Sequence, residues 1–299
     1  MSNGIKITYL GERGSYSHQA AAQLFPDASL EGMRNFNDVV GAVESGDFDK
    51  AIIPIENSIS GRIPDVHKLL LTMQLSIEAE YMLEIRHCFA VYGMRTIESP
   101  SLEIKTIYSH PQGFIQSRTF LHSHFPKADL IDMSDTASAA RLISERKEPG
   151  TAAITSPVAA REYGCNVLYE NISDVAENYT RFVVLGRDNI GDNVANADIT
   201  TIIFQVNHTP GALIRALSVF EEGGINLLKL ETYTISEKTA RPTFYIDAGA
   251  GLNDKRMIEV LRRLETRVAY VKLLGSYPAS AVRKRSSGFL PVDQPVGDK

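Results

Sequence analysis

In the stretch Ala51-Ile52-Ile53-Pro54-Ile55-Glu56-Asn57-Ser58, an almost wholly apolar run ends directly in three polar residues. A short apolar run bounded by polar residues is typical of a buried strand. The same order of strand, polar turn and helix recurs around it, with further strands expected at Ile5–Leu10, Ile104–Tyr108, Asp129–Met133 and Ala152–Ile154. Alternating strands and helices predict an α/β fold, with parallel sheets covered by helices on both faces.

The polar turns of this pattern all follow the carboxyl ends of their strands. In parallel sheets, ligands bind at that edge, where helix amino-termini present free N–H groups and partial positive charge. We therefore expect a site for a small anionic molecule there. Two of the helices have clear start signals, since Ser109 and Ser156 stand where N-caps belong, and Pro111 and Pro157 fit the first helical turn.

The composition excludes several classes of protein. The chain has 299 residues, which predicts about two domains, and a net charge of −5, which argues against a nucleic-acid-binding surface. No apolar run approaches the roughly 18 residues of a membrane span, and the amino-terminus lacks the apolar core of a signal peptide. Cys88 and Cys165 stand in no metal-binding or redox spacing. We therefore expect a cytoplasmic protein with two buried, reduced thiols and no nucleic-acid or membrane partner.

A second region follows residues 188–198, whose Asn, Asp and Gly residues are typical of a linker. Its helices are expected to begin at Thr209-Pro210 and at Asn253. Its strands are expected at Thr200–Val206, Ile225–Ile235, Thr243–Ala248 and Val268–Leu274. This βαββαβ order predicts a ferredoxin-like unit over residues 199–280. Residues 281–299 begin with a basic triplet and continue with Ser, Gly and Pro, which is typical of a flexible tail.

The sequence contains no recognisable nucleotide-binding or metal-binding motif. Gly11-Glu12-Arg13-Gly14 is neither a dinucleotide fingerprint nor a P-loop, because no later glycine or Lys-Ser/Thr follows at the required spacing. His122 and His124 are two residues apart, which on a helix points them to different sides, so no metal site is expected. Glu56-Asn57-Ser58 suits either a site or a helix N-cap. Arg181, at the mouth of a strand, suits either a carboxylate clamp or an exposed edge position.

Five polar or glycine-containing segments follow one another along the chain. They are Gly11-Glu12-Arg13-Gly14-Ser15-Tyr16-Ser17, Pro54-Ile55-Glu56-Asn57-Ser58 with Gly61, Ser109-His110-Pro111-Gln112 with Gln116, Asp135-Thr136-Ala137-Ser138-Ala139-Ala140, and Asn178-Tyr179-Thr180-Arg181-Phe182. In this order they resemble the prephenate dehydratase family. The ACT regulatory domain that follows in that family is similar in the stretches Pro210-Gly211-Ala212-Leu213, Gly224-Ile225-Asn226-Leu227 and Lys229-Leu230-Glu231. The resemblance covers about residues 5–275.

The resemblance implies a fold and an assembly. A catalytic region at residues 1–187 would have the two-lobed fold of periplasmic binding proteins, with its second lobe at about residues 85–165. The chain would cross to that lobe near Tyr81–Ala90 and return near Cys165–Asp174. An ACT domain at residues 199–280 would pair with its counterpart in another subunit, giving a homodimer or homotetramer. No helical segment precedes the first strand, so the fused chorismate mutase of some relatives is expected to be missing.

The resemblance also implies an activity, the conversion of prephenate to phenylpyruvate with loss of water and carbon dioxide, without a cofactor, on the route to phenylalanine. Thr180 would be the catalytic hydroxyl beside the leaving group, together with the family's Glu56, Asn57 and Ser58. The residues implied to bind substrate are Ser15, Ser109, Gln116, Thr136, Arg181 and Phe182. Arg181 would either anchor a carboxylate or hold the strand that carries Thr180.

In the ACT domain the resemblance implies a binding site for L-phenylalanine as effector. Its residues would be Pro210, Gly211, Ala212, Leu213, Asn226, Leu227 and Glu231. Gly211 suits the close approach of a ligand to the first helical turn. One departure is Glu231-Thr232-Tyr233-Thr234, where the family's regulatory element reads Glu-Ser-Arg-Pro. The strength of feedback and the choice of effector therefore stay open.

Two other functions are compatible with these residues. Arogenate dehydratase performs the same chemistry on a substrate with an amino group in place of the keto oxygen, and the quoted motifs do not separate the two. A non-catalytic protein that binds a small anion would use the same two-lobed fold. The run Thr180-Arg181-Phe182 and the lack of a DNA-binding segment favour the enzyme.

Overall fold

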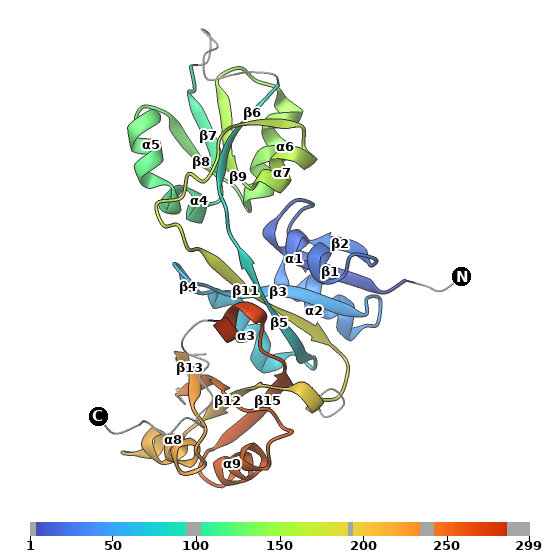
Figure 1. The fold of residues 1–299 in the computed structure, drawn as a ribbon, viewed down its shortest axis with the longest axis vertical. Helices are drawn as coiled ribbons and strands as arrows, with labels where there is room; N and C mark the ends of the chain where they lie inside the picture. Colours follow the sequence, from blue (N-terminus) through green and yellow to red (C-terminus); the bar gives the residue numbers. More distant parts are fainter. Residues whose placement is uncertain (1–3, 94–102, 191–193, 234–241, 286–299) are drawn as a thin grey trace. The chain divides into compact units, whose positions relative to one another are not determined.

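The computed structural model describes residues 4–93, 103–190, 194–233 and 242–285 (Figure 1). The chain divides into two compact units, each assembled from two separate stretches. The first unit comprises Met1–Ile63 and Leu83–Phe182, and the second comprises Pro64–Met82 and Val183–Lys299. The division therefore falls inside strands β5 (Ser76–Glu84) and β11 (Tyr179–Gly186), and not at the linker expected at residues 188–198.

The first unit begins with a lobe around strand β1 (Lys6–Leu10), which lies parallel between β2 (Ser29–Met33) and β3 (Lys50–Asn57). Helices α1 (Tyr16–Leu24) and α2 (Phe36–Glu44) connect these strands and pack on them. The fully buried apolar residues of this lobe include Ile7, Val43 and Ile52. The predicted order of parallel strands and helices is confirmed here.

The second lobe of the first unit is a five-stranded sheet with the strand order β10-β6-β9-β7-β8. Its strands are β6 (Cys88–Tyr92), β7 (Thr106–Ser109), β8 (Asp129–Asp132), β9 (Thr151–Thr155) and β10 (Cys165–Tyr169). One face carries α4 (Pro111–Gln116) and α5 (Arg118–His124), and the other carries α6 (Thr136–Arg146) and α7 (Pro157–Glu162) (Figure 1). Strand β7 is parallel to β8 and β9, as predicted, whereas β6 is antiparallel to β9 and β10.

One of the two predicted N-caps is confirmed and the other is wrong. Ser156 caps α7, since its Oγ accepts the N–H of Ala159 at 3.0 Å. Ser109 instead ends β7, because its backbone still pairs with β8. The cap of α4 is the next residue, His110, whose Nδ1 accepts the N–H of Gln112 at 3.2 Å.

Glu56-Asn57-Ser58 is not a helix N-cap. Strand β3 continues to Asn57 and turns back into the short strand β4 (Gly61–Arg62), so that Glu56 lies opposite Arg62. The polar triplet therefore lies at the tip of a β-hairpin. The two strands on either side of the turn are hydrogen-bonded to each other, which fixes the position of these residues.

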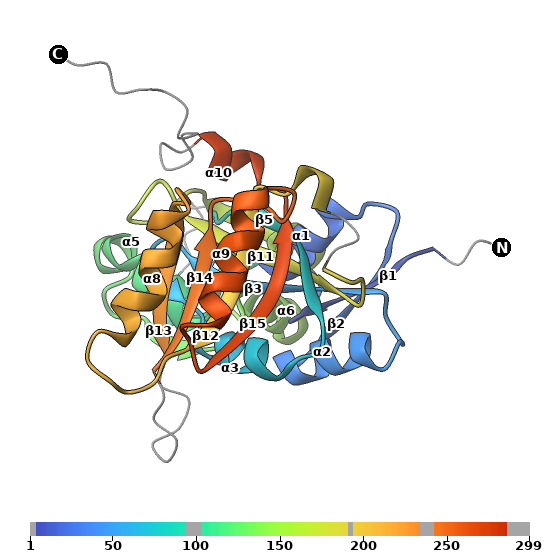
Figure 2. The same ribbon diagram turned by 90° about the horizontal axis from the view of Figure 1, so that it is seen from below.

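The second unit contains the expected βαββαβ arrangement. Its strands are β12 (Ile199–Gln205), β13 (Leu227–Tyr233), β14 (Thr243–Ala248) and β15 (Tyr270–Tyr277), in the antiparallel order β13-β14-β12-β15. Helices α8 (Ala212–Glu222) and α9 (Lys255–Glu265) lie side by side on one face of this sheet (Figure 2). The N-cap of α9 is Asp254 rather than Asn253. Residues 234 and 235 of the expected second strand lie outside the described residues.

The second unit also takes helix α3 (Pro64–Thr72) and the first part of β5. The ammonium of Lys272, on β15, donates to the carbonyl oxygens of Leu70, Leu71 and Met73 at 2.9, 2.9 and 2.6 Å. Carbonyls at the end of a helix lack partners within the helix, so this lysine caps α3. A side chain of the ferredoxin-like fold thus holds a segment that comes about two hundred residues earlier in the chain.

The predicted flexible tail is wrong for its first residues, which form helix α10 (Ala281–Arg285). Arg283 pairs with Glu80 at 2.8 Å, and the side chain of Glu80 is fully buried. Lys284 pairs with Asp198 at 2.6 Å, and both side chains are partly exposed. The remainder of the tail, residues 286–299, lies outside the described part of the chain.

Both cysteines are free thiols, with Cys88 buried and Cys165 half-buried, so full burial is confirmed only for Cys88. Burial raises the pKa of the Cys88 thiol to about 12 and that of the Cys165 thiol to about 11. Both are therefore protonated at neutral pH. Within the stretches that the structure describes, no helix has the length and apolar character needed to cross a membrane.

We expect Arg283→Ala to lower the free energy of unfolding by about 3 kcal/mol, because it removes one partner of a buried ion pair. Lys284→Ala is the matched control and should cost less than about 1 kcal/mol, since its pair is partly exposed. Urea unfolding of the full chain measures both. Equal effects of the two substitutions would show that the Arg283–Glu80 pair contributes no more than a surface contact.

Candidate active site

The hairpin turn after β3 fixes the side chain of Asn57. Its Oδ1 accepts the backbone N–H groups of Ile59 and Ser60, each at 3.0 Å. An amide oxygen held by two donors cannot exchange places with its NH₂ group without leaving both donors unpaired. Nδ2 therefore faces β11, where it lies 2.7 Å from Oδ1 of Asn178 and 3.0 Å from Oγ1 of Thr180.

Thr180 accepts this hydrogen bond and keeps its own hydroxyl hydrogen. It is 9% exposed, and no residue within the described ranges accepts a hydrogen bond from it. Ser58 holds the start of the same strand, since its Oγ accepts the N–H of Tyr179 at 2.9 Å and its N–H donates to the Tyr179 carbonyl at 2.8 Å. A hydroxyl held in this way can direct its hydrogen at a bound ligand.

Behind Thr180, a row of polar side chains leads from β11 to the second lobe. Asn178 is fully buried, and its Nδ2 donates to Oε1 of Gln116 at 2.9 Å. The same oxygen lies 2.9 Å from Nε2 of His87, whose Nδ1 lies 3.1 Å from the hydroxyl of Tyr16. Buried polar groups are costly without partners, so the members of this row depend on one another.

Arg181 follows Thr180 on β11 and is 1% exposed. Its Nη1 lies 3.1 Å from Oε1 of Glu56, on β3. Taking a guanidinium out of water is costly, so the carboxylate of Glu56 helps to keep it in the interior. The pair joins β11 to β3 directly beside Thr180.

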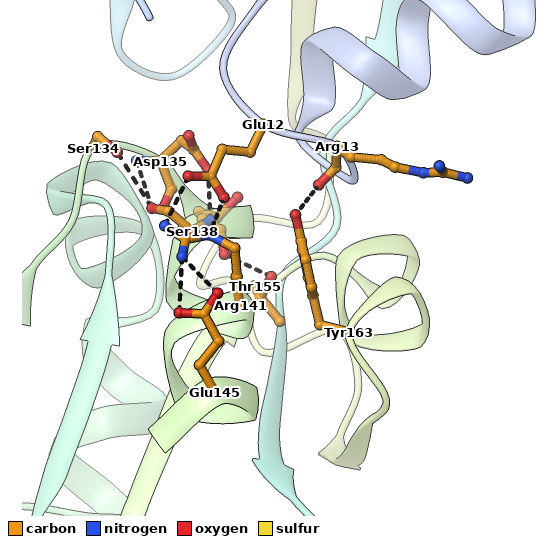
Figure 3. Close-up of polar contacts among 10 residues, drawn as sticks. Glu12, Arg13, Ser134, Asp135, Ser138, Arg141, Glu145, Thr155 and Tyr163 are labelled. Atoms are coloured by element: carbon orange, nitrogen blue, oxygen red, sulfur yellow. Dashed lines mark hydrogen bonds and ion pairs between the residues drawn. The ribbon is translucent and has the colours of Figure 1, made fainter. Parts of the chain in front are cut away.

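The loop after β1 meets the second lobe through charged and polar groups (Figure 3). Arg141, on α6, lies between two carboxylates, 2.6 Å from Oε2 of Glu12 and 2.9 Å from Oε1 of Glu145. The hydroxyl of Tyr163, beyond the end of α7, donates to the carbonyl of Arg13 at 2.8 Å. Both contacts attach the loop of one lobe to the other lobe.

Gly11 brings this loop against the starts of two helices. Its φ of +94° lies in the left-handed region, and an added Cβ would stand 3.3 Å from Oδ2 of Asp135 and 3.4 Å from Oγ of Ser15. Ser15 caps α1 by accepting the N–H of His18, and Asp135 caps α6 by accepting the N–H of Ser138. Two helix amino-termini therefore lie close to this loop, in agreement with the predicted placement of the polar turns.

Burial shifts the pKa of several groups in this region, among them one carboxyl and two imidazoles. It raises the pKa of the Asp135 carboxyl, and the charge of Glu12 raises it further, while backbone N–H groups oppose the shift. Burial lowers the pKa of the His87 and His110 imidazoles, because a charged ring is poorly solvated in the interior. Both histidines are therefore neutral at neutral pH.

Comparison with known proteins assigns the chain to a family. A family model described as prephenate dehydratase matches residues 7–190. The chain belongs to the prephenate dehydratase family. The bifunctional chorismate mutase/prephenate dehydratase of Enterobacter agglomerans is 36% identical over 285 residues, which cover 94% of this chain and 72% of that protein. Arogenate dehydratase 2 of Petunia hybrida is 33% identical over 291 residues, which cover 93% of this chain and 72% of that protein.

Solved structures agree with this assignment. The prephenate dehydratase of Arthrobacter aurescens, in complex with L-Phe, has a TM-score of 0.83 and 30% identity, over 92% of this chain and 90% of that one. GqqA, described as a novel type of quorum-quenching acylase, also has a TM-score of 0.83, with 29% identity over 93% of this chain and 99% of that one. The predicted two-lobed fold of the prephenate dehydratases is confirmed by the first of these similarities.

The structure brings part of the predicted prephenate dehydratase site together. The members joined by the contacts above are Glu56, Asn57, Ser58, Gln116, Thr180 and Arg181. Ser109 lies apart from them, fully buried and donating to the carbonyl of Ile154 at 2.8 Å. Thr136 starts α6, and its carbonyl accepts the hydroxyl of Thr155, while Phe182 is buried in the interior.

Sequence reasoning missed three residues of this region. Asn178 opens the motif Asn178-Tyr179-Thr180-Arg181-Phe182, so the sequence carries a signal for it. His87 and Asp135 were also missed, and His87 has no local signal because its partners lie 29 and 71 residues away. Over the described residues, no three His, Cys, Asp or Glu side chains are grouped so as to hold a metal ion.

We expect Asp135→Asn to stabilise the protein at pH 7. The raised pKa means that the ionised carboxylate destabilises the folded state, whereas asparagine keeps the capping oxygen without the charge. The gain should shrink at about pH 4, where Asp135 is increasingly protonated in the folded protein. Urea unfolding at the two pH values measures this difference.

Asp135→Ala is the control, because it removes the helix cap. Loss of the cap should lower the free energy of unfolding by about 1 kcal/mol. If the asparagine variant were less stable than the unmodified protein at pH 7, the prediction that the ionised Asp135 carboxylate destabilises the folded state would be wrong.

Proposed function

We propose that this protein is a prephenate dehydratase, which converts prephenate to phenylpyruvate with loss of water and carbon dioxide. The observation that carries the proposal is the Thr180 hydroxyl, whose oxygen accepts from Asn57 at 3.0 Å and whose hydrogen is left for a ligand. The family match over residues 7–190 includes this part of β11 and supports the same conclusion.

In the proposed reaction, the bond between the ring and its carboxylate breaks, and the electron pair enters the ring as it becomes aromatic. The C–O bond at the opposite ring carbon breaks and its electron pair stays on the oxygen. Carbon dioxide leaves, and the departing hydroxide takes a proton from the solvent to form water. Thr180 donates a hydrogen bond to that oxygen while negative charge develops on it. A threonine hydroxyl is a weak acid, so the gain comes from an oriented donor, and Asn57 supplies the orientation.

We assign Arg181 to the scaffold of the site rather than to a substrate carboxylate. Its guanidinium is buried and paired with Glu56, which supports a role in holding β11 and Thr180 in place. Glu56 then acts through Arg181, and Ser58 acts by fixing the backbone of β11 at Tyr179. The starts of α1 and α6 near Gly11 supply N–H groups that suit a dianionic substrate.

Arogenate is the second candidate substrate, and the similarity to arogenate dehydratase 2 of Petunia hybrida favours testing it. Purified protein is assayed with prephenate and with arogenate, by formation of phenylpyruvate and of phenylalanine respectively. Turnover of prephenate supports the proposal, a preference for arogenate assigns the second substrate, and turnover of neither refutes the enzymatic function.

We expect Thr180→Ala to lower kcat by roughly 10²–10⁴-fold, the range for loss of a positioned proton donor. Thr180→Ser keeps the hydroxyl and should recover most of the rate. Because Thr180 donates to no described residue, the melting temperature of both variants should stay close to that of the unmodified protein. An alanine variant with near-normal kcat would remove Thr180 from the reaction.

We also propose that residues 199–280 form an ACT domain that binds L-phenylalanine as an allosteric effector and pairs in a homodimer or homotetramer. The βαββαβ order and the L-Phe-bound structure from Arthrobacter aurescens support this assignment. The residues proposed to line the site are Pro210, Gly211, Ala212, Leu213, Asn226, Leu227 and Glu231. Gly211 is the N-cap of α8 and has a φ of +75°, a conformation that favours glycine.

We expect Gly211→Ala to raise the L-phenylalanine concentration for half-inhibition by about 10-fold, since the left-handed backbone becomes strained and the added Cβ meets the guanidinium of Arg215. Basal kcat should not change. Gly164→Ala is the control, because Gly164 is also left-handed, at φ +65°, but has no neighbour within 4 Å of an added Cβ. Dose–response curves compare them, and an unchanged response in the Gly211 variant would exclude this turn from the effector site.

A further inference from the structure

The buried imidazole of His87 lies between two polar side chains that the proposed chemistry does not use directly. Its ring is 3% exposed, with Nδ1 at 3.1 Å from the hydroxyl of Tyr16 and Nε2 at 2.9 Å from Oε1 of Gln116. A neutral imidazole donates from one nitrogen and accepts at the other. The function of His87 therefore depends on which nitrogen carries the hydrogen.

The position of the hydrogen on His87 follows from the orientation of Asn57. The amide of Asn57 has a fixed orientation because its oxygen accepts two backbone N–H groups. Its Nδ2 donates to Oδ1 of Asn178 at 2.7 Å. Asn178 must then turn its NH₂ group the other way, where it meets Oε1 of Gln116 at 2.9 Å. Gln116 therefore presents an oxygen to Asn178 and to His87.

The other atom of the Gln116 amide, Nε2, has a partner that fits this orientation. Its Nε2 lies 3.2 Å from Oγ of Ser60, and the Ser60 hydroxyl donates to Oε1 of Gln112 at 2.6 Å. Oε1 of Gln116 is thus an acceptor, and the group opposite it, Nε2 of His87, carries the hydrogen. A hydrogen on Nε2 leaves Nδ1 of His87 as an acceptor, which shares the single hydroxyl hydrogen of Tyr16 with the carbonyl of Arg86, 2.8 Å from that hydroxyl.

We propose that His87 is a positioning residue, whose Nε2–H locks the carboxamide of Gln116 and thereby, through Asn178 and Asn57, keeps the hydroxyl hydrogen of Thr180 free for the substrate. The proposal rests on the proposed function, because it assigns His87 to the same reaction. It extends the site by a residue that does not contact the reacting atoms.

The physical reason lies in what happens without that N–H group. If the amide of Gln116 turned over, its NH₂ would face the NH₂ of Asn178, and Asn178 would have to turn over as well. Asn178 would then point an NH₂ at Nδ2 of Asn57, which cannot turn because of its own backbone contacts. Nδ2 of Asn57 then keeps the Tyr179 carbonyl, at 3.2 Å, and Thr180 as its acceptors, and the two facing NH₂ groups displace the Asn57 amide from its place beside Thr180.

The orientation of the Gln116 amide does not depend on the charge of the His87 ring. Burial lowers the pKa of His87, so the neutral form prevails at neutral pH. A protonated ring would also keep its Nε2–H toward Gln116, and Tyr16 would then donate to the carbonyl of Arg86, which lies 2.8 Å from its hydroxyl. Both forms hold Gln116 in the same orientation.

The test compares steady-state kinetics of the full chain with His87→Phe and His87→Gln. We expect the phenylalanine variant to lose about 10- to 100-fold in kcat, as for a misplaced catalytic group, with KM within about 2-fold of normal. The glutamine variant should recover most of the rate, because its carboxamide can again donate to Gln116. Tyr16→Phe is a milder variant for use if His87→Phe does not fold, and should lower kcat by about 3- to 10-fold through loss of the donor to Nδ1.

A double-mutant cycle separates positioning from general damage. In a Thr180→Ala background, His87→Phe should cause no further loss of kcat, since there is no hydroxyl left to orient. A wild-type rate in both His87→Phe and Tyr16→Phe, or an equal loss with and without Thr180, would overturn the proposal.

The tautomer is measured independently of activity, by ¹⁵N NMR of protein labelled at histidine. We expect the His87 ring to carry its hydrogen on Nε2, and a hydrogen on Nδ1 alone would overturn the proposal. If the unmodified protein turned over neither prephenate nor arogenate, the proposed function and the catalytic role of His87 would fail together. The NMR result would then still decide the direction of the hydrogen-bonded row.

Discussion

Two backbone N–H groups hold the side-chain oxygen of Asn57. They thereby set which group donates and which accepts in the hydrogen bonds that run from Asn57 into the interior of the first unit. Because that amide has one orientation, the amides of Asn178 and Gln116 have one orientation each. Inversion of the Asn178 or Gln116 amide would leave buried groups unpaired, at about 1–3 kcal/mol for each group. Thr180, at the end of the row, accepts a hydrogen bond and gives none to the residues that the structure describes. A tight hairpin thus determines where a hydroxyl hydrogen is available.

The contacts of the loop after β1 with the second lobe have a different character. Two of them are polar and exposed or partly exposed, between Arg141 and Glu12 and between Tyr163 and the carbonyl of Arg13, whereas the contact of Ser156 with the carbonyl of Gly14 is buried. Exposed ion pairs contribute about 0–1 kcal/mol each, so such contacts break and re-form at little cost.

Local chemistry was sufficient to predict the α/β order, the βαββαβ unit and the cap at Ser156, since each depends on residues close in sequence. Family resemblance supplied Asn57 and Thr180, which the structure brings within hydrogen-bonding distance. Neither source predicts a pairing between distant residues of unrelated motifs. The Arg283–Glu80 pair joins positions about two hundred residues apart, so the start of the tail looked flexible. His87 was missed for the same reason, because its importance comes from the groups around it in space.

The capping of α3 by Lys272 has a consequence for how such a gene can recombine. Residues 199–285 look in sequence like an exchangeable module that begins after a linker. A hybrid joined at that linker would place Lys272 against a foreign helix end and Arg283 against whatever the other parent carries at the position of Glu80. Among relatives, residues 64–82 and 199–285 are therefore expected to be inherited together, as one block interrupted by the greater part of the first unit.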